Sequence, residues 1–152
     1  MSKIVQVTAT YNGNADQIFG SALRFSEMAE AMAGLASYAG LPANDTAIEG
    51  ETIVVDVTIL GLFKQLGHRI HIERIDPDKR MIQSRESGNG IRKWDHTLSV
   101  QPDGETVCWT DTIVVDAGMR TTVMAYFAAM MYKRRHRRRK ALAVSSRIVP
   151  AA

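Results

Sequence analysis

Apolar and polar residues alternate over much of this chain, and such alternation is typical of β-strands with one buried and one exposed face. Turn-prone residues such as Asn12-Gly13-Asn14 and Asp76-Pro77-Asp78 interrupt the alternation at short intervals. The pattern predicts about six antiparallel strands. They cover residues 3–11, 52–62, 68–75, 81–86, 94–100 and 107–115.

The last two predicted strands form a hairpin that holds the most informative chemistry of the chain. Asp103-Gly104 is a strong signal for a two-residue type I′ turn, in which both central residues have positive φ. That turn sets the cross-strand partners, so that Val100 faces Val107, Leu98 faces Trp109, His96 faces Asp111 and Trp94 faces Ile113. One face of the hairpin is then apolar except for the pair His96 and Asp111.

Helical patterns follow the first strand and return near the end of the chain. Asn14 or Asp16 can cap a first short helix, and a second helix starts near Ser26 and ends at Gly40 and Pro42. A long helix is expected from Met119 to about Leu142. Its apolar stripe consists of Met119, Val123, Tyr126 or Phe127, and Met130. Residues 143–152 show no pattern, and we expect this tail to fray.

These elements predict a single α+β domain that spans residues 1–152. An antiparallel sheet must bury one face, and the long helix is the predicted element with an apolar stripe large enough to pack against that face. We therefore expect a curved antiparallel sheet of about six or seven strands around the C-terminal helix. A length of 152 residues suffices for one sizeable hydrophobic core.

Composition and charge narrow the class of protein. Hydrophobic residues make up 45% of the chain and charged residues 23%, as in soluble globular proteins. Residues 133–140 hold seven of the nineteen lysines and arginines, so the other twelve face sixteen acidic residues, a net charge of −4. The net positive charge of the chain therefore comes from one local run of basic residues, and it does not indicate that the whole surface binds nucleic acid.

The sequence also indicates a compartment. The N-terminus has no signal-peptide pattern, and no apolar stretch reaches the length of a membrane span. The single cysteine, Cys108, favours a reducing compartment. We therefore expect a cytoplasmic protein.

Several segments resemble a known superfamily. Residues 90–96 (Gly-Ile-Arg-Lys-Trp-Asp-His) resemble a strand with a Trp-x-His motif, and residues 104–111 (Gly-Glu-Thr-Val-Cys-Trp-Thr-Asp) resemble its Gly-x-Thr…Asp return strand. The passage from Pro42 to Gly50 and the arginine-rich end of the last helix are similar to the same relatives. On these motifs, residues 3–142 resemble small bacterial members of the SRPBCC superfamily. START-like lipid carriers, birch-pollen-allergen-like proteins and polyketide cyclases belong to it.

The resemblance implies a helix-grip fold, in which a curved antiparallel sheet holds the C-terminal helix and two short helices follow the first strand. It also implies a cavity between sheet and helix for an apolar or amphipathic molecule. A minority of members catalyse cyclisation, dehydration or hydrolysis there, so the fold alone does not imply an activity. Phe63 and His68 stand near positions where relatives carry a tryptophan. The expected ligand-binding residues are Trp94, His96, Trp109, Asp111, Met119, Val123, Tyr126, Phe127 and Met130.

His96 and Asp111 are the candidate catalytic residues, and the pair supports three interpretations. Asp111 can orient the imidazole so that its other nitrogen serves the cavity as a general acid–base. The pair can also anchor a polar group of a ligand, or it can be a structural pair that satisfies two buried polar groups. No serine or cysteine is placed next to His96 on its own face, so a hydrolytic triad is unsupported.

The other polar residues of interest are two histidines and the basic run near the C-terminus. His68 and His71 point to opposite faces of a strand, so we expect no metal site, and we expect no cofactor. The basic run consists of Lys133, Arg134, Arg135, Arg137, Arg138, Arg139 and Lys140. A solvated face or pairing with the acidic body explains the run, and contact with an anionic membrane surface is the alternative. Nucleic acid is disfavoured because no nucleic-acid-binding motif accompanies the run.

Three functional hypotheses follow. The first is a non-enzymatic carrier or sensor that holds an apolar or amphipathic small molecule between the sheet and the last helix. The second is a cyclase- or dehydratase-type enzyme with His96 as general acid–base oriented by Asp111. The third is a module that binds a membrane or a protein through Lys133–Lys140. An exposed strand edge would also allow a homodimer.

Overall fold

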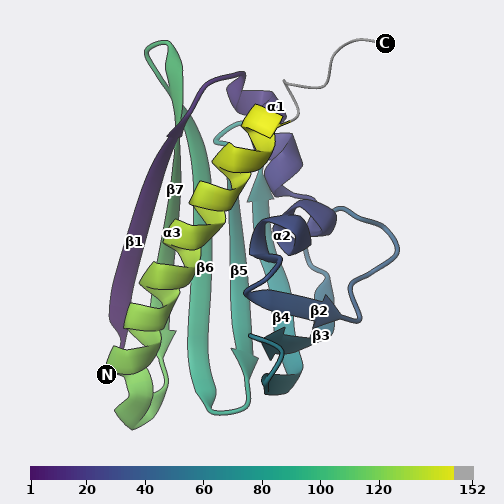
Figure 1. Ribbon diagram of the computed structural model, residues 1–152, viewed down its shortest axis with the longest axis vertical. Coiled ribbons are helices and arrows are strands. Elements are labelled where there is room, and N and C mark those ends of the chain that lie inside the picture. Colours follow the sequence, from purple (N-terminus) through teal and green to yellow (C-terminus); the bar gives the residue numbers. More distant parts are fainter. Residues whose placement is uncertain (146–152) are drawn as a thin grey trace.

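The computed structural model describes residues 1–145, in which seven strands and three α-helices form one layered unit (Figure 1). In chain order the elements are β1 (Lys3–Tyr11), α1 (Ala15–Ala22), α2 (Phe25–Met32), β2 (Ala36–Ala39), β3 (Thr52–Ile59), β4 (Phe63–Asp76), β5 (Met81–Gly88), β6 (Ile91–Asp103), β7 (Thr106–Asp116), a 3₁₀ turn (Gly118–Arg120) and α3 (Thr121–Ser145). α3 continues past the predicted end at Leu142, and residues 146–152 of the predicted tail lie outside the described residues.

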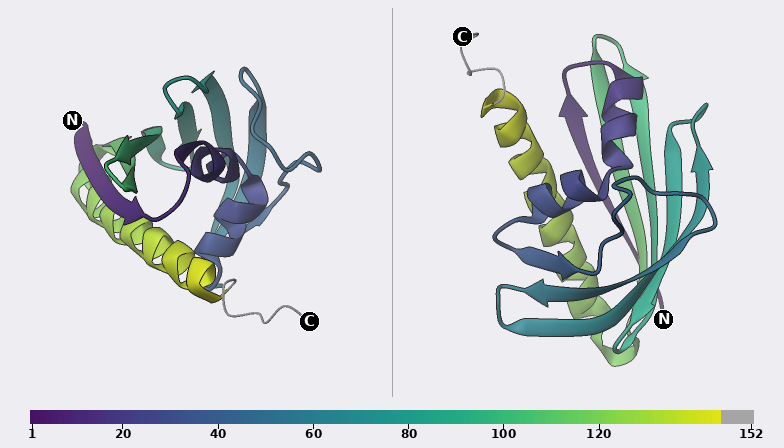
Figure 2. Two further views of the ribbon diagram at one scale, coloured as in Figure 1. Left: turned by 90° about the horizontal axis from the view of Figure 1, so that it is seen from above. Right: turned by 90° about the vertical axis from the view of Figure 1, so that its right-hand side faces the viewer.

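The strands form one antiparallel sheet in the order β1-β7-β6-β5-β4-β3-β2. β1 and β2 are its two edges, so α1 and α2 carry the chain from one edge to the other. Register shifts between Val55 and Val57 and between Ile72 and Arg74 add local bends. The sheet curls around α3, and α2 lies between α3 and the β3–β4 side (Figure 2). This architecture is a helix-grip fold, which confirms the fold class expected from the sequence.

The β6–β7 hairpin forms as predicted, but its turn lies one residue later. Gly104 and Glu105 connect the strands, and Gly104 alone of these two has positive φ, at 59°, as in a type II′ turn. Each cross-strand partner is therefore shifted, so that Leu98 rather than His96 faces Asp111. A shift of two residues keeps every side chain on its predicted face, because side chains alternate with a period of two.

α2 is shorter than predicted, because it ends at Met32 rather than near Gly40. The residues that follow form β2, which pairs with β3 and places Tyr38 opposite Val57. Pairing satisfies the backbone groups along the edge of β3, and this gain outweighs the helical pattern of a short segment. The change directs Tyr38 to the concave side of the sheet.

α3 exposes the stripe that its spacing predicts to be buried. Met119 in the preceding 3₁₀ turn and Val123, Tyr126 and Met130 on α3 are each at least 42% exposed, so the prediction is wrong for these four residues, whereas the alternative Phe127 is half-buried. The inner face of the helix consists instead of Ala125, Ala128, Tyr132, Arg135, His136 and Arg139. Small alanines let α3 approach β1 and β7 closely, and the polar residues of its second half find partners inside the protein.

Candidate functional site

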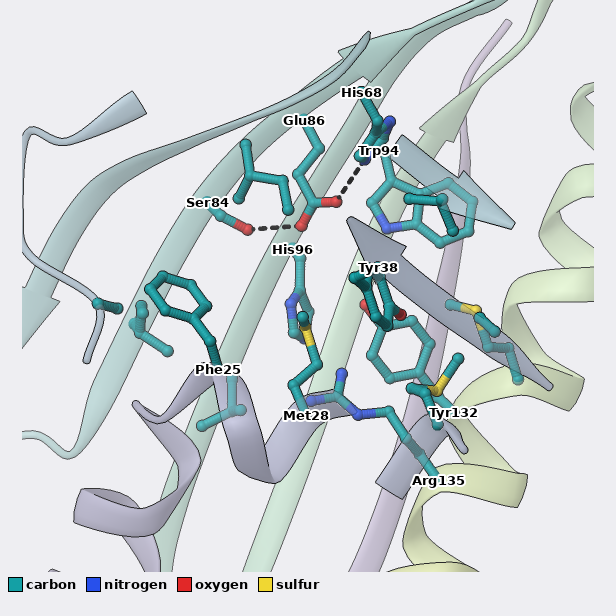
Figure 3. Close-up of a pocket in the computed structure, with 18 of the residues that line it drawn as sticks. Phe25, Met28, Tyr38, His68, Ser84, Glu86, Trp94, His96, Tyr132 and Arg135 are labelled. Atoms are coloured by element: carbon teal, nitrogen blue, oxygen red, sulfur yellow. Dashed lines mark hydrogen bonds and ion pairs between the residues drawn. The ribbon is translucent and has the colours of Figure 1, made fainter. Parts of the chain in front are cut away.

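A cavity of about 150 Å³ lies between the concave face of the sheet and helices α2 and α3 (Figure 3). Most of its lining is apolar and includes Phe25, Met28, Met32, Leu35, Val57, Ile59, Ile70, Ile72, Ile82, Ile91, Trp94, Leu98, Met124, Phe127 and Met131. Polar lining residues include Tyr38, Gln65, His68, Ser84, Glu86, His96, Tyr132 and Arg135. A concave apolar surface with a few convergent polar groups is typical of small-molecule sites.

One polar cluster lies on the sheet wall of this cavity. His68 of β4 donates from Nε2 to Oε2 of Glu86 over 3.0 Å, and the Ser84 hydroxyl donates to Oε1 over 2.9 Å. Both carboxylate oxygens of Glu86 are thus engaged within the wall. A Cβ at Gly88 would lie 3.2 Å from His68 Nδ1, so the missing side chain lets the imidazole pack there.

Sequence reasoning missed this cluster. It considered His68 as a departure from relatives and as a possible metal ligand, and it left Ser84 and Glu86 unremarked. Their spacing of two residues, which places both on the same face of β5, is the signal that would have found them.

A second polar cluster is centred on Asp111 of β7, which is 1% exposed. His96 donates from Nε2 to Oδ1, and His136 donates from Nε2 to Oδ2, each over 2.7 Å. The other ring nitrogen of His136, Nδ1, lies 2.6 Å from the Tyr11 hydroxyl. The predicted contact between His96 and Asp111 is present, although it runs diagonally across the strands. His136 was missed because it stands inside the basic run.

Burial determines the protonation of this second cluster. Burial opposes the charge of Asp111, but the hydrogen bonds from His136 and His96 outweigh it and hold the pKa of the carboxyl well below its usual range. Burial lowers the pKa of His136 against the attraction of Asp111, and burial raises the pKa of Tyr11 to about 12. Neutral His136 therefore donates to Asp111 and accepts the Tyr11 hydroxyl at Nδ1. With its Nε2 engaged, His96 has Nδ1 left for the cavity that it lines.

Two arginines of the basic run, Arg135 and Arg139, are buried on the inner face of α3 rather than solvated, and Arg139 shows the pairing with an acidic residue that the sequence offers as the other explanation of the run. Arg139 pairs with both carboxylate oxygens of Glu27 on α2, and its guanidinium lies 4.0 Å from the ring centroid of Trp109. Arg135 lines the cavity, with its guanidinium carbon 5.5 Å from the ring centroid of Tyr132. Four other residues of the run are exposed, as expected: Lys133, Arg137, Arg138 and Lys140.

The structure divides the expected ligand-binding residues into three groups. Trp94, His96 and Phe127 line the cavity. Trp109 and Asp111 are buried behind it, where Asp111 supports His96. The four exposed residues of the predicted stripe (Met119 in the 3₁₀ turn, and Val123, Tyr126 and Met130 on the outer face of α3) do not line it, and the last two border an open groove between α3 and β1.

Three further observations concern metals, the thiol and membranes. Among residues 1–145, no group of three or more His, Cys, Asp and Glu side chains is placed to hold a metal ion. Cys108 is half-buried, and its Sγ lies 3.8 Å from the Thr110 hydroxyl. Within the described chain, no helix combines the length and the apolar character that a membrane crossing requires.

The fold and the cavity place this chain in the helix-grip class. No protein-family model matches the sequence, and no curated protein matches it. Solved structures do match. CV1439 from Chromobacterium violaceum is 9% identical with a TM-score of 0.69, over 89% of this chain and 93% of that one. TTHA0849 from Thermus thermophilus is 12% identical with a TM-score of 0.64, over 92% and 99%.

A third similar structure is Ara h 8.0201, a Bet v 1-like protein. It is 10% identical with a TM-score of 0.62, over 90% of this chain and 96% of that one. At identities of 9–12%, the likeness is one of fold. It agrees with the fold that the sequence motifs imply.

Proposed function

We propose that this protein is a non-enzymatic carrier or sensor that binds an apolar or amphipathic small molecule in the cavity between the sheet and α3. The observation that carries the proposal is the cavity itself, about 150 Å³ in volume, with apolar walls and polar groups at a few fixed positions. Transfer of an apolar molecule from water to such walls is favourable. The polar groups would orient the bound molecule.

The polar groups of the cavity are held in place by other residues. Glu86 is fixed by His68 and Ser84, and His96 is fixed by Asp111. Because these side chains are already ordered, a ligand that contacts them pays little of the entropy of fixing loose side chains. Such preorganisation supports a binding role.

A pair of substitutions on one strand tests the proposal. Val57 is buried and lines the cavity from β3, whereas Val54 on the same strand points outward. We expect at least one class among fatty acids, sterols and flat aromatic molecules to raise the melting temperature of the wild type and of Val54→Phe with increasing dose. Val57→Phe, which fills the cavity, should lose the shift. Native mass spectrometry of the purified protein would identify a molecule that copurifies.

Two results would contradict the proposal. One is a wild type whose melting temperature none of these classes raises. The other is a shift that persists unchanged in Val57→Phe, because the probe would then bind elsewhere.

The contact between His96 and Asp111 supports a second candidate, an enzyme of the cyclase or dehydratase kind. Such reactions begin with removal of a proton next to a carbonyl group, and a histidine oriented by a carboxylate is suited to that step. The probe is 2-indanone in heavy water, whose α-protons exchange for deuterium when a base removes them. Exchange above the solvent rate that His96→Gln abolishes would support the enzyme, and equal rates with and without protein would exclude it for this probe.

A further inference from the structure

Arg135 is a charged residue of the cavity that the function proposed above does not use. It projects from the inner face of α3, is 7% exposed and lines the cavity next to Tyr132. Figure 3 shows its side chain extending from α3 toward the region between Met28 and His96. Its charge therefore faces the cavity.

Arg139, one turn later on the same helix, shows how this protein accommodates a buried arginine. Glu27 accepts hydrogen bonds from its guanidinium, and Trp109 lies against it. Arg135 is as deeply buried, but its guanidinium has no hydrogen bond and no ion pair with any of residues 1–145, and its Nε is buried without an acceptor. Burying a charge is unfavourable unless an opposite charge pairs with it.

The acidic groups whose charges act on Arg135 form hydrogen bonds with other residues. Asp111 and Glu27 act on its charge through space, but the oxygens of Asp111 bind two histidines and those of Glu27 bind Arg139. Glu86 lies across the cavity, and its two carboxylate oxygens accept hydrogen bonds from His68 on β4 and Ser84 on β5. An anion that enters the cavity would therefore meet an arginine with free donors.

Two hydroxyl groups lie on the same side of the cavity as Arg135. Tyr38 and Tyr132 both line it, and Figure 3 shows them beside the arginine. Burial raises the pKa of each phenol, so both hydroxyls keep their protons and can donate to an anion. Arg135 and these tyrosines form a donor-rich end in an otherwise apolar chamber.

We propose that the molecule bound in the cavity is a monocarboxylic acid whose carboxylate pairs with Arg135. The inference rests on the proposed binding function and names its ligand class. A guanidinium matches the planar carboxylate through two parallel hydrogen bonds. A carboxylate brings one negative charge to one arginine, whereas a phosphate monoester would bring about two charges into a cavity that Glu86 also lines.

The size of the cavity sets the body of this acid. A cavity of about 150 Å³ is comparable to one that encloses benzene. An aromatic ring or a short aliphatic chain fits that space, with its apolar end against Phe25, Ile70 and Ile72 on the walls. Small aryl-substituted and medium-chain carboxylic acids are the class that the geometry favours.

Matched acids and alcohols test the proposal by isothermal titration calorimetry at pH 7.5. The probes are 3-phenylpropanoate and octanoate, each compared with the primary alcohol of the same carbon skeleton, together with octyl phosphate. The proteins are the wild type, Arg135→Met and Arg138→Met, the last an exposed arginine of the same helix. We expect the wild type and Arg138→Met to bind the acids about tenfold or more tightly than the alcohols. Arg135→Met should lose that preference and still bind the alcohols.

The outcomes separate this inference from the function on which it rests. Equal affinity of the wild type for acids and alcohols, or a preference that survives in Arg135→Met, would overturn the role of Arg135 and leave cavity binding intact. Tighter binding of octyl phosphate than of octanoate would overturn the assignment of a carboxylate. Absence of binding by any probe would contradict both proposals. Should Arg135→Met fail to fold, the comparison of acid and alcohol in the wild type still decides.

Discussion

Replacing Asp111 by alanine removes the centre of the hydrogen-bonded cluster that ties α3 to β7. Asp111 accepts hydrogen bonds of 2.7 Å from both His96 and His136, and only 1% of its surface is exposed. In Asp111→Ala both histidines lose the acceptor of their Nε2–H group, and His136, which is 3% exposed, is the less able of the two to find a replacement in solvent. The cost of an unsatisfied buried donor then falls on each histidine.

The expected loss follows from the two contacts. A hydrogen bond to a charged group contributes about 1.5–3 kcal/mol. The two bonds share one carboxylate, and its removal also relieves the burial of a charge, so their contributions do not add in full. We expect Asp111→Ala to lower the free energy of unfolding by about 3–5 kcal/mol. Asp111→Asn keeps one acceptor, so about 1–3 kcal/mol is expected for it.

Equilibrium unfolding in urea, followed by tryptophan fluorescence, measures this loss. The ring of Trp109 lies 5.4 Å from that of His136 and reports on the same region. Asp103→Ala, at the exposed end of β6, is the control and should change stability by less than about 0.5 kcal/mol. A loss below about 1 kcal/mol in Asp111→Ala, with an unchanged dependence on urea, would refute the reasoning.

Other substitutions and pH test separate parts of the structure. Gly104→Val should lower the free energy of unfolding by about 1–2 kcal/mol, and with it the urea midpoint, because φ of 59° disfavours a β-branched residue; an unchanged midpoint would contradict the turn. Burial lowers the pKa of His136, so the unfolded chain binds protons first below about pH 6.5 and stability should fall on acidification. Urea titrations at pH 7.5 and 5.5 measure this change in stability, and His136→Gln should make stability depend less on pH. Arg139→Gln, which breaks the buried ion pair with Glu27, should lower the free energy of unfolding by about 2–4 kcal/mol. The exposed control Arg137→Gln should lower it by less than about 0.5 kcal/mol, and equal losses would argue against the buried ion pair.

Six of the seven strands in the described part of the chain were predictable because their signal is local, whereas β2 forms where the sequence predicts a helix. Those that begin at Lys3, Thr52 and Met81 start where the alternation of apolar residues predicts. Asn14 caps α1, with its side chain accepting hydrogen bonds from two backbone N–H groups of the first turn. Such features depend on neighbouring residues and need no knowledge of the rest of the fold.

The orientation of α3 was not predictable in the same way, because two stripes compete on this helix. The apolar stripe obeys helical spacing, whereas the stripe that is buried contains Arg135, His136 and Arg139, which periodicity assigns to the surface. Their burial depends on partners from distant segments, since Glu27 is 112 residues from Arg139 and Tyr11 is 125 residues from His136. The periodicity of one sequence does not show which distant residues pair with one another. For the same reason the sequence did not predict the donor-rich end of the cavity around Arg135.

Asp111 connects the stability of the fold to the properties of the cavity. Arg135 and His136 are consecutive, so their side chains point about 100° apart around α3. The contact of His136 with Asp111 fixes the rotation of the helix, and that rotation directs Arg135 into the cavity. The same carboxylate holds His96 in the cavity wall. Asp111→Asn should therefore weaken the binding of octanoate by a larger factor than the binding of 1-octanol, which does not need the arginine. Titration calorimetry of the folded variant measures both factors, and equal weakening would mean that Arg135 keeps its position without this contact.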